Sequence, residues 1–230
     1  MKLFVFSDPH GDLPDMRGQG HYDVVCCCGD FSPLEYQRSY ALMMDWIDGE
    51  LCDWLKTFDY DKFIFIAGNH DFCCEKSMFK EDFAKLLFKH NLAGKVVYLQ
   101  NELFEYGGKT FFGCPYSDIP YWAFSMADPT LEYHKGGYYD LPDGVDVMLV
   151  HQAPDFNNVG TSDFDSRWAR NFGSYALLKV IEEHQPKYVF CGHIHSGNHE
   201  KSVLDNTTIY NTSIKNEQYR VTYEPLIIEI

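Results

Sequence analysis

The sequence has few basic residues, no long hydrophobic run and no spaced cysteine framework. Its 19 Lys and Arg residues are outnumbered by 34 Asp and Glu residues, and the formal net charge of −15 opposes binding of DNA, RNA or anionic lipid. No stretch approaches the roughly 18 apolar residues of a membrane-spanning helix, and the first residues contain too few apolar side chains for a signal peptide. We therefore expect a soluble protein that binds neither membranes nor nucleic acid polymers.

The eight cysteines are not arranged like those of a secreted disulfide scaffold. Cys26, Cys27 and Cys28 lie together in one apolar run, which indicates core positions of a strand. Cys73 and Cys74 are adjacent, and we favour small packing residues over a redox switch beside a site. This cysteine usage predicts a reducing, cytoplasmic environment.

The length and composition favour one globular domain over residues 1–230. A chain of 230 residues with 45% apolar and 17% aromatic residues can bury one sizeable core. Short, continuously apolar runs predict strands that are covered on both faces. These runs are residues 3–6, 24–28, 63–67, 96–99, 111–113, 145–150, 188–191, 207–210 and 226–230.

Amphipathic segments between these runs predict helices over residues 35–58, 81–90 and 175–183. Gly49 weakens the first pattern and allows a break there. Ser174 is placed to cap the third helix, and Pro186 follows its end. Strands alternating with covering helices predict a layered α/β fold.

Residues 115–144 form one long irregular stretch that is rich in aromatic side chains. Tyr121, Trp122 and Phe124 can form either a satellite hydrophobic cluster or a wall that stacks a base or aryl group of a substrate. Arg167 and Arg170 are candidates for a phosphate clamp, although an exposed surface explains them equally well.

Polar residues follow five of the predicted strands at the point where each strand ends. They are Asp8 and His10, then Gly29-Asp30, then Gly68-Asn69-His70-Asp71, then His151, and finally Gly192-His193-Ile194-His195. Ligands bind at the carboxyl ends of strands in open α/β sheets, so we expect these segments to converge. Each residue alone suits a turn or an ordinary buried histidine, but together they predict a metal site.

The types of these residues restrict the metal. A mixture of imidazole, carboxylate and amide groups without a thiolate suits Mn²⁺, Fe or Zn²⁺, and it argues against an all-oxygen Ca²⁺ site. We expect divalent cations of this kind, with Mn²⁺ as the first choice.

These motifs, in this order, resemble those of the calcineurin-like metallophosphoesterase superfamily. The resemblance implies a two-sheet β-sandwich flanked by helices, with the metals at one edge. Gly113-Cys-Pro-Tyr116 and Val150-His-Gln-Ala-Pro154 resemble a small branch that includes mammalian brain proteins described as cyclic-nucleotide phosphodiesterases.

The resemblance also implies roles for individual residues. Asp8, His10, Asp30 and His195 would bind one cation, and Asp30, Asn69, His151 and His193 would bind the other. A hydroxide shared by the cations would attack phosphorus. His70 would protonate the leaving oxygen, with Asp71 orienting its ring.

The resulting expectation is a metal-dependent phosphoesterase acting on a small diester or monoester, such as a cyclic nucleotide. A protein phosphatase is less favoured because Phe-Ser-Pro-Leu follows Asp30, where that branch has Asp-Arg-Gly. A nuclease is less favoured because the net charge of −15 repels a polyanion. A non-catalytic scaffold is less favoured because His70 and the ligand set are all present.

Overall fold

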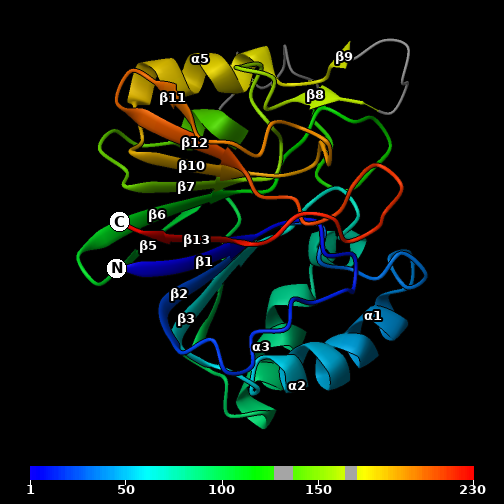
Figure 1. The fold of residues 1–230 in the computed structure, drawn as a ribbon. Coiled ribbons are helices and arrows are strands. Elements are labelled where there is room, and N and C mark those ends of the chain that lie inside the picture. Colours follow the sequence, from blue (N-terminus) through cyan, green and yellow to red (C-terminus); the bar gives the residue numbers. More distant parts are fainter. Residues whose placement is uncertain (127–136, 164–169) are drawn as a thin grey trace.

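Two β-sheets pack face to face and are covered by helices on their outer sides (Figure 1). The computed structural model describes residues 1–126, 137–163 and 170–230. The first sheet contains, in spatial order, β13 (Leu226–Glu229), β1 (Lys2–Phe6), β2 (His21–Cys28), β3 (Asp59–Ile66) and β4 (Val96–Tyr98). The second contains β11 (Ser202–Leu204), β12 (Thr207–Asn211), β10 (Tyr188–Cys191), β7 (Val147–Val150), β6 (Lys109–Cys114) and β5 (Glu102–Tyr106). The predicted two-sheet α/β fold is confirmed.

The helices lie on the outer faces of the two sheets. The first sheet is covered by α1 (Tyr40–Trp46), a π-helical turn (Ile47–Leu51), α2 (Cys52–Trp54) and α3 (Phe79–Lys89). The second sheet is covered by α5 (Tyr175–His184). Short 3-10 turns occur at Phe72–Glu75 and Gly137–Asp140, and β8 (Thr161–Ser162) pairs with β9 (Arg170–Asn171) outside the sheets. In the described residues, no helix is long and apolar enough to cross a membrane.

The core between the sheets is built from alternating strand residues. Cys26 and Cys28 face this core together with Phe111, Leu149 and Phe190. Cys27 points to the opposite face, where it packs among residues of the helix layer. All eight cysteines are buried and free, so Cys26, Cys27 and Cys28 are core residues as predicted.

The helix predictions hold with differences at their ends. Ser174 Oγ accepts a hydrogen bond from Leu177 N at 2.9 Å, which confirms the predicted cap of α5. The helix predicted over residues 35–58 begins only at Tyr40, after the cap residue Ser39. Around Gly49 the chain widens into the π-helical turn, so the helix does not break there.

Two edge strands of the second sheet, like the two-residue strands β8 and β9, were not predicted from the apolar pattern. β5 (Glu102–Tyr106) has two glutamates among its five residues, and β11 (Ser202–Leu204) is only three residues long. Both lie at the edges of the second sheet, where one side faces solvent and an apolar run is not required.

The parallel arrangement of the central strands positions the candidate site. β1, β2 and β3 run parallel in the first sheet, and β6, β7, β10 and β12 run parallel in the second. Their carboxyl ends therefore meet at one edge of the sandwich, as predicted.

Candidate metal centre

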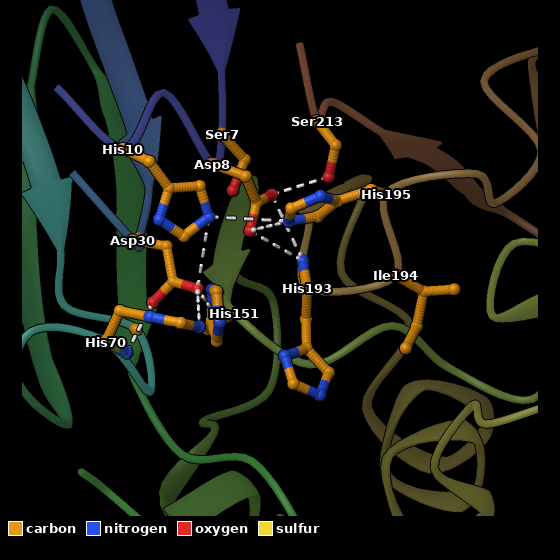
Figure 2. A network of polar contacts seen from close by, with 12 residues as sticks. Ser7, Asp8, His10, Asp30, His70, His151, His193, Ile194, His195 and Ser213 are labelled. Carbon is orange, nitrogen blue, oxygen red and sulfur yellow. Dashed lines mark hydrogen bonds and ion pairs between the residues drawn. The ribbon is translucent and has the colours of Figure 1, made fainter. Parts of the chain in front are cut away.

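The loops after β1, β2, β3, β7 and β10 bring together all seven predicted metal ligands and His70. The residues are Asp8, His10, Asp30, Asn69, His70, His151, His193 and His195, and all but His193 are at least nine-tenths buried. Figure 2 shows that Asp8, His10, Asp30 and His195 direct their polar atoms toward one another. Residues distant in sequence thus form one polar cluster inside an apolar fold.

Asp8 lies at one end of this cluster, beside two histidines. Its Oδ1 is 3.5 Å from His195 Nε2, and His195 Nε2 is 3.4 Å from His10 Nε2. The other oxygen of Asp8 accepts hydrogen bonds from Ser213 Oγ and from His193 N. The three donor atoms of Asp8, His10 and His195 lie within 4.8 Å of one another, which is close enough for one cation.

Asp30 lies in the middle of this polar cluster, close to three histidines. Its Oδ2 is 3.4 Å from His151 Nε2, 3.8 Å from His10 Nε2 and 3.9 Å from His70 Nε2. Donor atoms of Asp8, Asp30 and His151 also lie within 4.8 Å of one another. The Asp30 carboxylate therefore joins the donors around Asp8 to those around His151.

Asn69 completes the far side of the cluster. Its Oδ1 is 2.9 Å from His151 Nε2 and 2.8 Å from His193 Nδ1. An amide oxygen and two imidazole nitrogens therefore converge beside Asp30.

Hydrogen bonds behind the ligands fix which imidazole nitrogen faces the centre. Nδ1 of His151 lies 2.9 Å from Cys28 O, and Nδ1 of His195 lies 3.0 Å from Asn216 O. A carbonyl oxygen accepts, so each Nδ1 carries hydrogen and each Nε2 is directed inward. Such partners are typical of histidines that bind metals.

The pKa values of the histidines are shifted in opposite directions. Burial opposes charge on His151 and His195, but the Asp30 carboxylate raises the pKa of His151 to about 9 and Asp8 does the same for His195. Burial lowers the pKa of His10 and of His193 to about 3. Two carboxylates thus attract positive charge into this cluster, and bound divalent cations would supply it in place of protons. The donor set fits such cations.

The backbone at the site is held in an uncommon conformation. Asp8, His10, Asp30 and His193 have positive φ angles of 55°, 45°, 54° and 69°. A left-handed non-glycine residue costs about 1–3 kcal/mol, and such residues are concentrated at functional sites. Backbone hydrogen bonds between the loops maintain these conformations. Asp8 N donates to Gly29 O at 3.0 Å, and His10 N donates to Asp30 O at 3.0 Å.

Two glycines allow the loops to approach one another. A Cβ at Gly68 would collide with Asp30 and with the ring of His151, and a Cβ at Gly192 would collide with Ser7 and Asp8. Neither glycine has a positive φ, so close approach is what requires them.

Asp71 does not orient the His70 ring, and that part of the prediction was wrong. Its carboxylate accepts hydrogen bonds from three backbone amides, those of Asp30 at 2.8 Å, Ser32 at 3.0 Å and Gly68 at 2.7 Å. Through these hydrogen bonds Asp71 links the loop after β2 to the loop after β3.

A cavity of about 490 Å³ opens beside this polar cluster. The residues that line it are Asp30, Asn69, His70, Asp118, Ile119, Pro120, Trp122, Ser162, Phe172, His193, Ile194, His195, Glu217 and Tyr219. A larger cavity of about 670 Å³ lies between residues 12–19 and 221–227 and contains none of the predicted ligands.

The three aromatic residues proposed as a substrate wall have different environments. Trp122 lines the cavity, and its ring centroid is 4.4 Å from that of His70. Tyr121 is 95% exposed and Phe124 is buried in the core. Arg170 is exposed, with its guanidinium 5.5 Å from the Phe172 ring centroid, whereas Arg167 lies outside the described residues.

Tyr219 was not predicted from the sequence. Its ring centroid is 4.9 Å from that of His10 and 5.1 Å from that of His195, and its φ is 59°. The residue lies in a turn near the end of the chain that belongs to no recognised motif, so only the fold reveals its position.

The fold and this donor set define the class of metallophosphoesterases. The profile of the calcineurin-like phosphoesterase family matches residues 1–197, and the chain belongs to that family. The resemblance seen in the sequence is therefore confirmed.

Known proteins of similar sequence or fold agree with this assignment. The chain is 26% identical over 247 residues to metallophosphoesterase domain-containing protein 1 of Homo sapiens, covering 100% of this chain and 71% of that protein. A UPF0046 protein of Caenorhabditis elegans is 28% identical over 242 residues, covering 100% and 75%. The structure of phosphopantetheinyl hydrolase from Mycobacterium tuberculosis matches with a TM-score of 0.53 at 16% identity, covering 98% and 95%, which shows a shared fold.

Proposed function

We propose that this protein is a dinuclear metal-dependent phosphoesterase that hydrolyses a small phosphodiester or phosphomonoester, such as a cyclic nucleotide. The observation that carries the proposal is the position of the Asp30 carboxylate, within 3.8 Å of His10 and 3.4 Å of His151. Asp8, His10 and His195 form one set of neighbouring donors, and Asn69, His151 and His193 form the other.

These two groups of donors, sharing Asp30, would bind the two cations, with Mn²⁺ favoured and Fe or Zn²⁺ as alternatives. The chemistry that two such cations would supply is binding of phosphoryl oxygens and a lower pKa for a water molecule that would act as the nucleophile.

In this proposal His70 acts on the leaving group. It lines the cavity, and its Nε2 lies 3.9 Å from Asp30 Oδ2. Donor atoms of His10, Asp30 and His70 lie within 4.8 Å of one another, but we assign His70 to neither cation. From this position a protonated Nε2 donates its proton to the leaving oxygen. Trp122, beside His70, provides the apolar wall against which a base or aryl group packs.

The proposed substrate is small and soluble. The net charge of −15 opposes long polyanions, and the cavity of about 490 Å³ matches the volume of small-molecule sites. A reducing, cytoplasmic location is proposed because all eight cysteines are free and buried.

Metal analysis of purified variants tests the dinuclear site. Wild-type protein prepared without chelator should contain two cations per chain. Asp30→Asn should weaken binding of both, because Asp30 connects the two groups, whereas His195→Ala should chiefly affect one. Asp205→Asn serves as the control, because Asp205 lies in the exposed turn between β11 and β12, at the opposite end of the sheet from the cluster. A saturating stoichiometry of one that Asp30→Asn leaves unchanged would refute the proposal.

The His70→Asn variant tests the catalytic assignment. It should retain its metals and lose roughly 10²- to 10⁴-fold in turnover, the usual contribution of general acid catalysis. The loss should be larger for an alkoxide leaving group than for nitrophenolate, which needs less protonation. Loss of metal in this variant would show that His70 is a ligand.

A substrate panel with Mn²⁺ tests the substrate class. The panel compares cyclic nucleotides, nucleoside monophosphates, phosphopeptides and single-stranded DNA. Preferential cleavage of the phosphopeptides or the DNA would favour a protein phosphatase or a nuclease and would exclude the small-molecule proposal.

A further inference from the structure

The segment that follows β2 contains a side chain that contacts His70 directly. Gln37 Oε1 is 2.6 Å from Nδ1 of His70. The other end of the same amide, Nε2, donates a hydrogen bond to Leu34 O at 2.9 Å. Because the amide nitrogen is used by a carbonyl group, the atom that faces His70 is the amide oxygen.

An amide oxygen only accepts hydrogen bonds. The Nδ1 atom of His70 therefore carries a hydrogen atom whenever this contact is formed. In a neutral imidazole only one nitrogen is protonated, so Nε2 then has a free lone pair. The two hydrogen bonds of Gln37 thus specify the tautomer of His70.

The remaining contacts fix the orientation of the ring. His70 N donates to Asp30 Oδ1 at 2.7 Å, which holds the backbone. The indole of Trp122 lies on one side, with ring centroids 4.4 Å apart, and the His10 ring meets it edge-on at 4.8 Å. With Nδ1 held by Gln37, Nε2 is the nitrogen left on the side of Asp30 Oδ2, 3.9 Å away.

Within the described parts of the chain, the partner of His70 Nδ1 is this amide and not a carboxylate. The nearest one in sequence, Asp71, accepts hydrogen bonds from backbone amides of the loops after β2 and β3. The group at Nδ1 is neutral and fixed at its other end.

We propose that Gln37 is a positioning residue that holds His70 with hydrogen on Nδ1 and with Nε2 toward the reacting phosphate. Its catalytic consequence rests on the proposed function. In the reaction, the imidazolium of His70 transfers its Nε2 proton to the leaving oxygen as the bond from phosphorus to that oxygen breaks. Nδ1 keeps its own proton on Gln37, the ring becomes neutral, and solvent returns a proton to Nε2.

The tautomer can be observed without activity. We would record long-range ¹H–¹⁵N spectra of the histidine rings in metal-free protein at mildly alkaline pH, and assign the His70 signals by their loss in His70→Asn. In the wild type, Nδ1 should appear as a protonated nitrogen and Nε2 as an unprotonated one. Gln37→Leu should give a mixture of tautomers or the opposite one, and Gln37→Glu, which keeps an acceptor, should retain the wild-type form.

Kinetics then separate positioning from a merely structural role. Gln37→Leu should lower kcat by roughly 10- to 100-fold for a substrate with an alkoxide leaving group, the range typical of residues that orient a functional histidine. With a nitrophenolate leaving group kcat should fall much less, and KM and metal content should stay at wild-type values. Gln37→Glu should restore most of kcat. The matched control is Gln19→Leu, which changes an exposed glutamine away from the site and should alter none of these quantities.

Several results would overturn the proposal. A wild-type spectrum with hydrogen on Nε2 alone would do so without any variant, and so would an unchanged His70 tautomer in folded Gln37→Leu. Equal losses of kcat for both leaving groups, or a loss of metal, would assign Gln37 a structural role. If the wild type hydrolyses no phosphoester at all, the proposed function fails, while the ring spectra still decide whether Gln37 fixes His70.

Discussion

Replacing Gly68 by alanine should damage both the stability of the fold and its capacity to bind metal. A Cβ at this position would lie 2.6 Å from the backbone nitrogen of Asp30 and even closer to Asp30 Oδ1. Real Cβ atoms do not approach other heavy atoms so closely, so the loop after β2 and the loop after β3 must move apart. The loop after β2 contains Asp30, the residue that connects the two groups of donors.

The size of the effect follows from the type of contact. Overpacking a well-packed site costs about 1–3 kcal/mol, and we expect about 2–3 kcal/mol because one of the opposed atoms belongs to the backbone. For a domain of this size each kcal/mol lowers Tm by about 2–4 °C, so Gly68→Ala should lower it by roughly 4–12 °C. Displacement of Asp30 should also weaken Mn²⁺ binding by roughly 10- to 100-fold.

Gly49→Ala provides a control of the opposite sign. Gly49 lies in the π-helical turn, is exposed, and has no heavy atom within 4 Å of the position of an added Cβ. Alanine should stabilise the protein there by about 0.4–1 kcal/mol, since it restricts the unfolded chain.

Thermal unfolding with EDTA and Mn²⁺ titration by calorimetry measure both quantities. If Gly68→Ala matches the wild type in Tm and in Mn²⁺ affinity, the loops after β2 and β3 do not approach each other as closely as inferred. A comparable loss of stability in Gly49→Ala would show that the effect is not specific to the site.

Three further predictions follow from other parts of the fold. Trp122→Ala should raise KM for nucleotide substrates roughly 5- to 150-fold if its ring stacks on the base, while hydrolysis of bis-p-nitrophenyl phosphate changes much less; equal losses on all substrates would give Trp122 a structural role. Ser174→Ala removes the side-chain cap of α5 and should cost about 1 kcal/mol, a Tm decrease of about 2–4 °C, and an unchanged Tm would contradict the cap. None of the eight buried thiols should react with a disulfide reagent in the native protein, whereas rapid reaction of Cys73 and Cys74 would support the redox alternative.

The sequence was sufficient to predict the edge at which the site forms. Each predicted ligand follows an apolar strand, and parallel strands bring their carboxyl ends together regardless of how far apart they are in the chain. Asp8 and His193 are separated by 185 residues, yet the backbone nitrogen of His193 donates to the Asp8 carboxylate. Residue type and strand context predicted this convergence, because both are local properties of the sequence.

The partners of the ligands could not be predicted in the same way. Asp71 follows His70 directly, and adjacency suggested a contact between them, but consecutive side chains point in different directions. The side chain that hydrogen-bonds Nδ1 of His70 is that of Gln37, 33 positions earlier in an irregular segment. Such a segment has no periodicity from which the direction of a side chain can be deduced.

This difference has a physical basis that applies to the whole site. A ligand is restricted to a few residue types by the chemistry of a divalent cation, so its identity is visible in the sequence. A group that only has to accept one hydrogen bond from an imidazole can be a carbonyl group, as Cys28 and Asn216 provide for His151 and His195, or an amide, as Gln37 provides for His70. Because backbone carbonyls belong to every residue type, this outer layer leaves little trace in the sequence. It follows that His70, whose partner is a side chain, is the one of these three histidines whose orientation a single substitution can release.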